Sequence, residues 1–274
     1  MHAGRRRAAG ARASPALRVW PCLLALTGCA ATPAPDERQE SSWPSWERVG
    51  AAAVEAARSP ATWAPLLGAG LLQIGDAGEE ISEWAADETP LFGSNQAADT
   101  ASNVLRWTAV GGYAASVIAG SATSPDGARP GPARTLGVGA LAAAVNIGAT
   151  QGLKRATGRE RPDASNDRSF PSQHASSAAL FATLGSRQVE TVAPAGRRGE
   201  LLRWGFGGIA AATGWARVEG GEHFPSDVLA GAALGHFVGA LFHTAFLDEK
   251  ERQSLVPELG ISRRGWYVGV RGVF

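Results

Sequence analysis

Apolar stretches alternate with polar breaks along most of the chain, without an internal repeat or a convincing pair of strands. The apolar stretches predict helices near 46–58, 61–75, 100–122, 135–154, 174–188, 200–217 and 226–247. The breaks at 76–99, 121–134, 155–173 and 186–199 are rich in Gly, Pro, Asp, Ser and Arg, as connectors should be. We therefore expect an all-α bundle of about six to seven helices.

The last residues depart from helical spacing. Trp266, Val268, Val270 and the terminal Phe274 predict one short strand. Because a lone strand leaves its backbone groups unpaired, we expect it to pack on the edge of the domain or to stay loose. The predicted fold class is all-α with one short C-terminal strand.

The first thirty residues have the charge layout of a secretory signal. Several arginines precede a short apolar run at 19–26, with no acidic residue before or within it. The run is too short to span a bilayer as a helix. It ends in Leu26-Thr27-Gly28-Cys29, which resembles the site at which bacterial lipoprotein precursors are cleaved and lipidated on the cysteine. The alternative is a plain signal peptide with an incidental cysteine.

These segments divide the chain into four predicted parts. Residues 1–28 are a signal peptide of the lipoprotein type, 29–45 a polar tether, 46–250 a helical domain and 251–274 a C-terminal extension. Cleavage would leave Cys29 as the first residue, where an acylated thiol cannot form a disulfide. Because Ala30 rather than Asp follows it, the resemblance to Gram-negative lipoproteins favours the outer membrane, with the site facing the periplasm.

Composition excludes two classes of protein and leaves the membrane question open. A chain with 45% hydrophobic residues and a net charge of +1 is neither intrinsically disordered nor a strongly basic nucleic-acid binder. Residues 228–247 carry no charge and are long enough to cross a bilayer. A mean hydropathy of −0.08 is low for six spanning helices, and the abundant Gly and Ala suit tight packing in a compact domain equally well. Both a membrane-embedded and a bilayer-tethered domain are compatible with the sequence.

Candidate chemistry lies in three clusters, of which the first is the basic segment 154–162. Lys154 ends an apolar helix, and Arg161-Pro162 follows seven positions later. Lysine occurs at only two positions in the chain, so the place of Lys154 is informative. Taken alone, the segment is also typical of a helix C-terminus whose basic side chains complement the dipole and face water.

The second cluster is Pro171-Ser172-Gln173-His174, at the start of an apolar helix. Ser172 is the expected N-cap, so the backbone N–H groups of the first turn would point toward an anion, with His174 beside them. A capped helix with a surface histidine is the alternative.

The third cluster runs from Arg217 to Asp227. His223 and Asp227 lie four positions apart, across a turn into a helix that Pro225 and Ser226 would start, so the carboxylate can reach the imidazole. An aspartate that accepts from one ring nitrogen fixes the tautomer and leaves the other nitrogen able to attack. A purely structural His–Asp pair is the alternative.

Together the clusters supply three fixed cations, a helix N-terminus and two histidines, one of them with a carboxylate partner. The cations are Lys154, Arg161 and Arg217. This inventory suits in-line transfer of a phosphoryl group without a metal, because Arg and Lys can hold the charge on the equatorial oxygens.

The order and spacing of the clusters resemble the three-part signature of the type 2 phosphatidic acid phosphatase and vanadium haloperoxidase superfamily, over roughly 100–247. That signature reads Lys, six residues, Arg-Pro; then Pro-Ser-Gly-His; then Ser-Arg, five residues, His, three residues, Asp. It is matched here by Lys154, Arg161 and Pro162, by Pro171, Ser172 and His174, and by Arg217, His223 and Asp227. Two positions depart from it: Gln173 stands where the family has Gly, and Ala216 where it usually has Ser.

The resemblance implies a helical bundle of the acid phosphatase and haloperoxidase type, with a role for each matched residue. His223 would attack phosphorus and form a phosphohistidine, Asp227 would orient it, and His174 would protonate the leaving oxygen and later activate water. The phosphate oxygens would be held by Lys154, Arg161, Arg217, the Ser172 hydroxyl and the backbone at Gln173. In place of glycine, Gln173 adds a Cβ and an amide that crowd or decorate the pocket.

The sequence therefore predicts a metal-independent phosphatase at the bacterial cell envelope, acting on a phosphomonoester or diphosphate, with a phosphorylated lipid as the expected substrate. It predicts membrane association, and no cofactor, nucleic-acid partner or protein partner. One alternative is a non-catalytic envelope lipoprotein that binds a phosphorylated headgroup, with Gln173 blocking turnover. Another is a vanadium haloperoxidase that binds vanadate in the same pocket. His236 and His243, seven positions apart, are predicted to be core or interface residues.

Overall fold

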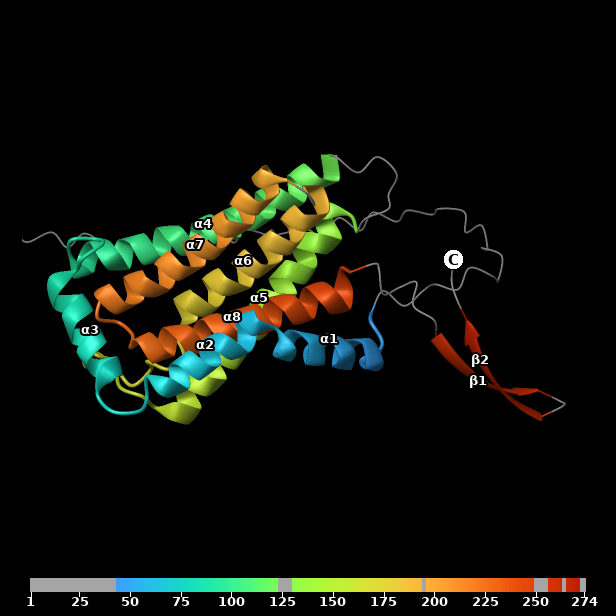
Figure 1. Cartoon of the computed structure of the whole chain (residues 1–274), viewed down its shortest axis with the longest axis horizontal. Helices are drawn as coiled ribbons and strands as arrows, with labels where there is room; N and C mark the ends of the chain where they lie inside the picture. The colour runs from blue at the N-terminus through green and yellow to red at the C-terminus, as the bar shows by residue number, and fades with distance from the viewer. Residues whose placement is uncertain (1–42, 123–129, 194–195, 249–255, 263–264, 272–274) are drawn as a thin grey trace, which may run out of the picture. The chain divides into compact units, whose positions relative to one another are not determined.

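The computed structural model describes residues 43–122, 130–193, 196–248, 256–262 and 265–271. The described chain forms eight helices and two strands (Figure 1). The helices are α1 (Trp46–Arg58), α2 (Pro60–Leu71), α3 (Ala77–Glu88), α4 (Asn95–Ala122), α5 (Pro132–Thr157), α6 (Gln173–Val192), α7 (Arg197–Glu219) and α8 (Pro225–Phe246), and the strands are β1 (Val256–Ser262) and β2 (Gly265–Arg271). The predicted signal peptide, Cys29 and most of the tether lie outside the described residues.

The helical class is as predicted, with one helix more than the expected six to seven. The additional helix is α3, inside the segment 76–99 that the sequence assigns to a break. Its acidic residues and the neighbouring glycines hide the apolar period, which explains the error. A second correction concerns α6, which continues to Val192 through the start of the break expected at 186–199.

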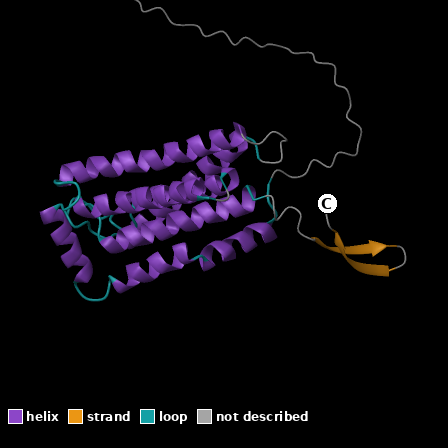
Figure 2. Cartoon of the chain, turned by 45° about the horizontal axis from the view of Figure 1, so that its top comes forward, coloured by secondary structure: helices purple, strands orange, loops and turns teal. Residues whose placement is uncertain are grey.

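The C-terminal strand also has a partner that the sequence did not reveal. β2 pairs antiparallel with β1, and Leu259 lies opposite Val268 in the register. Figure 2 shows this hairpin in orange and the helices in purple. Pro257 and Gly260 disfavour a strand in β1, and therefore the pattern there gave no strand signal. Pairing satisfies one edge of each strand, so the expectation of a lone strand is wrong.

α6 and α8 form the centre of the helical bundle, and the other long helices pack around them (Figure 1). α6 contacts α4, α5, α7 and α8, while α8 also contacts α1 and α2. α3 lies at one end of the bundle, inclined to the long helices, where it packs against α7 and α8. The second signature cluster therefore begins one central helix, α6, and the third ends in the first turn of the other, α8.

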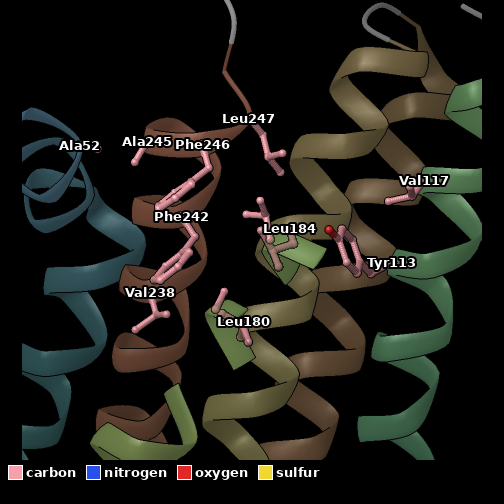
Figure 3. Packing of buried hydrophobic residues seen from close by; sticks show 12 residues of the cluster. Ala52, Tyr113, Val117, Leu180, Leu184, Val238, Phe242, Ala245, Phe246 and Leu247 are labelled. Carbon is pink, nitrogen blue, oxygen red and sulfur yellow. The ribbon is translucent and has the colours of Figure 1, made fainter. Parts of the chain in front are cut away.

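The largest apolar cluster fills the space between α8, α6 and α4. Leu180 and Leu184 of α6 are fully buried and lie between the α8 side chains and Tyr113 of α4 (Figure 3). On α8, Phe242 and Phe246 stack with ring centroids 5.3 Å apart. Burial of these side chains fixes α6 against α8.

Small residues let α6 and α8 approach closely at the other end of their contact. A Cβ placed on Gly235 would overlap the carbonyl oxygen of Ser176, and one on Gly231 would lie 2.5 Å from the carbonyl oxygen of Ser172. The same contact lets the Ser172 amide donate to the Asp227 carbonyl at 3.0 Å. Close packing of the two helices thus brings the second and third clusters together.

Among the helices that the structure describes, two are long and apolar enough to cross a membrane, by length and composition only. They are α5 and α8, with 28% and 56% of their most apolar windows buried inside the protein. Burial in the bundle accounts for more of the apolar character of α8 than of α5. His236 on α8 is half-buried, and its Nδ1 lies 2.8 Å from the hydroxyl of Thr62 on α2, as expected for an interface histidine.

Candidate active site

Lys154 lies in the last turn of α5 and is buried. Gly158 ends the helix in the left-handed conformation, with φ 54°, and the chain then folds back over the helix end. The Lys154 ammonium donates to the carbonyl of Arg168 and, at 3.3 Å, to that of Ser169. The returning segment therefore fixes the lysine in the interior, unlike a basic side chain that only complements a helix dipole in water.

The second cluster forms the start of α6, as the sequence predicts. Ser172 is the N-cap, and its side chain accepts from the amide of Ala175. His174 Nε2 lies 3.0 Å from the side-chain Oδ1 of Asn103 on α4. The Gln173 amide nitrogen donates to Ser177 at 3.1 Å, whereas its buried carbonyl oxygen has no hydrogen-bond donor among the described residues.

Arg217 lies in the last turn of α7 and is almost completely buried. Its guanidinium group forms ion pairs with Asp99 of α4 and, at 2.7 Å, with Glu222, and it donates to Ser102 at 3.2 Å. Arg161 reaches the same Glu222 carboxylate from the segment after α5. Glu222 thus joins the two arginines that the sequence assigns to phosphate binding.

The predicted nucleophile, His223, is 1% exposed and sits between α7 and α8. Its Nδ1 faces the Asp227 carboxylate at 3.9 Å, and the Ser169 hydroxyl lies 3.4 Å from the same nitrogen. Ser169 donates to Asp227 at 2.5 Å, and Arg159 contacts the other carboxylate oxygen at 2.8 Å. With Nδ1 directed at these groups, Nε2 is the ring nitrogen positioned for attack on a substrate.

Burial and nearby cations keep both site histidines neutral at neutral pH. Burial lowers the pKa of His223 to about 4, and the charges of Lys154 and Arg217 lower it further, whereas the Asp227 carboxylate raises it. Burial, followed by the charge of Arg217, lowers the pKa of His174 to about 3. A neutral His223 has the lone pair that a nucleophile needs.

The predicted site residues come together in space. The charge of Lys154 interacts with those of Arg161, Arg217 and Asp227, and His174 interacts with His223 and both arginines. Ser172 and Gln173 adjoin His174 at the start of α6. Beside Arg161 opens a cavity of about 880 Å³, lined on its other side by the acidic face of α3.

Several residues around the site were not assigned by the sequence. They are Asp99, Ser102, Asn103, Arg159, Ser169 and Glu222. Arg159 and Glu222 stand inside the first and third clusters, but their spacing alone did not distinguish them from solvated charges. Asp99, Ser102 and Asn103 share one face of α4, with the i, i+3 and i+4 spacing that could have signalled a polar contact surface. Within the described residues, no group of three or more His, Cys, Asp or Glu is placed to hold a metal ion.

Comparison with known families agrees with this geometry. Residues 135–251 match the PAP2 superfamily, and this span contains all three signature clusters. Residues 135–251 are thus similar to the PAP2 superfamily. The match begins within α5 and ends after α8, so α1 to α4 and the C-terminal hairpin lie outside it.

Two proteins of known description are similar to parts of this chain. A lipid A 1-phosphatase from Porphyromonas gingivalis is 35% identical over 106 residues, which are 39% of this chain and 21% of the relative. The chain thus matches only about a fifth of the length of this curated relative. The crystal structure of a transmembrane PAP2 type phosphatidylglycerolphosphate phosphatase from Bacillus subtilis is 22% identical, with a TM-score of 0.49, and covers 71% of this chain and 94% of that one.

Proposed function

We propose that the chain is a metal-independent phosphatase that hydrolyses a phosphomonoester or diphosphate through a phosphohistidine at His223. The observation that carries the proposal is the setting of this ring. Its Nδ1 is directed at Asp227 and Ser169, and the buried cations Lys154 and Arg217 act on it. This arrangement presents a neutral nucleophile to an anionic phosphorus centre.

In the first step, Nε2 of His223 attacks phosphorus and the bond to the leaving oxygen breaks. His174 donates a proton to that oxygen, while Asp227 balances the positive charge that forms on the phosphorylated imidazole. The equatorial oxygens are held by Lys154, Arg161, Arg217, the Ser172 hydroxyl and the backbone amide at Gln173. The guanidinium and ammonium groups stabilise the charge of the transition state.

In the second step, His174 accepts a proton from water, and the resulting hydroxide attacks phosphorus. The N–P bond breaks, inorganic phosphate leaves and His223 is again neutral. The low pKa of His174 leaves the ring unprotonated at neutral pH, which is the form that a base needs. For the acid role its pKa must rise, and the charge of a bound phosphate does this by opposing Arg217 and Arg161, whose charges lower that pKa.

A phosphorylated lipid at a bacterial membrane is the substrate class that the surface supports best. Large apolar side chains are exposed on α5 and α2, among them Val145, Ile147, Leu66 and Leu67. The lipid A 1-phosphatase resemblance points to the same class of substrate. A site held at the membrane by these helices, and by an acylated Cys29, would meet lipid headgroups at high local concentration.

A second candidate is a lipoprotein that binds a phosphorylated headgroup without turnover. The observation that favours it is Gln173, whose side chain occupies the first turn of α6, where the family has glycine and where phosphate would approach. If Gln173 blocks turnover, Gln173→Gly creates activity in a protein that otherwise only binds phosphate.

The experiment is phosphate release by the wild-type protein and His223→Ala, in EDTA, on phospholipid, polyprenyl diphosphate and soluble phosphate esters. We expect turnover on at least one phosphorylated lipid, and loss by at least about a thousandfold in the variant. His236→Gln is the matched control, because it changes a histidine that bonds to Thr62 away from the signature. Phosphate binding without turnover on any substrate would reject the phosphatase and favour the lipoprotein.

A further inference from the structure

Glu222 bridges the two arginines that would hold phosphate. Its Oε2 accepts from Arg161 Nη1 and, at 2.7 Å, from Arg217 Nη2. Carboxylate and phosphate oxygens are both acceptors that match the guanidinium fork. Under the proposed function, the carboxylate therefore lies on the donors that a substrate phosphate would use.

Both arginines could bind a larger anion than this carboxylate. The buried Nε atoms of Arg161 and Arg217 have no hydrogen-bond partner among the described residues. One oxygen of Glu222 serves both guanidinium groups. The phosphate of a monoester brings three oxygens and a charge near −2, so it can occupy more of these donors than a single carboxylate oxygen does.

The backbone beside Glu222 is anchored while its side chain has space to move. The amides of Glu222 and His223 both donate to the Arg217 carbonyl, at 3.1 and 3.2 Å. The Glu222 side chain is 23% exposed, and the cavity of about 880 Å³ beside Arg161 is also lined by Gly221. Rotation of the side chain can thus release the arginines without moving the predicted nucleophile.

We propose that Glu222 is an intramolecular competitor of phosphate for Arg161 and Arg217. The proposal rests on the proposed function for the identity of the anion. Substrate phosphate displaces the carboxylate on binding, and the carboxylate returns to the arginines as inorganic phosphate leaves. Only the fraction of molecules with a displaced carboxylate binds, so the competitor weakens the apparent affinity for phosphate and favours product release.

The test is Glu222→Gln, which keeps the size of the side chain and removes its charge. We expect the Kd of inorganic phosphate, measured by calorimetry on the full chain in detergent, to fall about tenfold, as loss of a charged competing hydrogen bond allows. The inhibition constant of phosphate as a product should fall by the same factor. Glu160→Gln is the matched control, because it removes an exposed carboxylate from the same segment as Arg161 and should leave the Kd unchanged.

If Glu222 only held the two arginines in place, its substitution would raise the Kd of phosphate instead of lowering it. Two arginines without their ion-pair partner would then bind phosphate less tightly. An unchanged or higher Kd in Glu222→Gln would therefore overturn the proposal. Thermal unfolding gives an independent readout: phosphate should raise the Tm of Glu222→Gln by more than that of the wild type. Glu222→Ala should tighten phosphate binding as well, which keeps the test valid if one variant folds poorly.

Binding and turnover separate this proposal from the phosphatase function. Tighter phosphate binding in Glu222→Gln, together with no turnover by the wild type, supports the competitor and rejects the phosphatase. Turnover by the wild type with the same phosphate Kd in both proteins rejects the competitor alone. Absence of phosphate binding in both proteins also overturns the competitor.

Discussion

Ser169 shows how a residue outside the family signature can position the residues within it. The His223 and Asp227 side chains are 3.9 Å apart, which is too long for a good hydrogen bond. The Ser169 hydroxyl donates to Asp227 at 2.5 Å and lies 3.4 Å from His223 Nδ1, so it can relay the orientation of the carboxylate to the ring. Ser169 itself is fully buried next to the Lys154 ammonium.

Ser169→Ala should lower kcat about tenfold with little change in KM, because it removes one hydrogen bond to a charged group and leaves the phosphate donors in place. Steady-state kinetics on the best lipid substrate measures both constants. Ser165→Ala, on an exposed position of the same segment, is the control. Ser169→Thr keeps the hydroxyl and should restore most of the rate. Equal losses in Ala and Thr variants would instead mean that packing, not the hydroxyl, is what Ser169 provides.

The depressed pKa of His174 has a consequence for stability. Its folded pKa is about 3, against 6.5 for an ordinary histidine, so the unfolded chain binds more protons between these values. The contribution of His174 to the free energy of unfolding is fully present above pH 6.5 and is lost as the pH falls toward 3. The loss is at most about 1.4 kcal/mol per pH unit, and smaller where solvent screens the ring.

His174→Gln should therefore lose less stability on acidification than the wild type. The measurement is the free energy of unfolding of both proteins, in detergent, at neutral and mildly acidic pH. Comparing the two proteins cancels the contributions of the other histidines. Parallel pH profiles would show that His174 is not held in its neutral form by the fold.

At the scale of elements, Glu219 of α7 holds the segment between α3 and α4 by hydrogen bonds. Its buried carboxylate accepts from the amides of Leu91 and Phe92 and from the indole of Trp215. Asn95 of α4 donates to the Glu219 carbonyl at 2.7 Å. These bonds fix the start of α4, from which Asp99 and Asn103 reach the site. The helices before α5 are thereby coupled to the part of the chain that matches the PAP2 superfamily.

The contact between α6 and α8 leaves no room for a side chain at Gly235. A Cβ there would overlap the Ser176 carbonyl and lie 2.9 Å from the Leu180 amide. Gly235→Ala should separate the helices, lower stability by about 1–3 kcal/mol and reduce activity, because Ser172 and Asp227 approach across this contact. Thermal unfolding and phosphate release measure the two effects. The control is Gly208→Ala on α7, where nothing lies within 4 Å of the added methyl group and stability should be unchanged or higher.

The same elements show which parts of the fold and the site can be predicted from the sequence alone. The signature positions and seven helix centres could be predicted because apolar periodicity and motif spacing are local properties. α3 and β1 could not, since acidic residues in one and Pro257 and Gly260 in the other mask the local pattern, and tertiary contacts decide the outcome. The hydrogen bond of Ser169 and the ion pairs of Asp99 and Glu222 join positions far apart along the chain, so no local sequence pattern predicts them.

At the scale of the whole molecule, the distribution of apolar surface bears on the membrane question. α8 is central to the bundle, so much of its apolar surface is buried against other helices. α5 is different: Leu141, Val145, Ile147 and Leu153 are exposed along it, and only 28% of its apolar window is buried. Several large apolar side chains exposed along one helix are costly in water and indicate contact with lipid or another apolar partner. We therefore expect the helices, and not only an acyl chain, to hold the protein at the membrane.

Cys29→Ser separates the two modes of attachment. It should abolish incorporation of labelled fatty acid, yet leave the protein in the membrane pellet after alkaline carbonate extraction, because the apolar surface of α5 remains. Cys22→Ser is the control, since the predicted cleavage removes that residue and both readouts should match the wild type. Release of Cys29→Ser into the soluble fraction would show that a single lipid anchor supplies the attachment. The exposed face of α5 would then have to be covered by protein, and the site would reach its substrate from a tether.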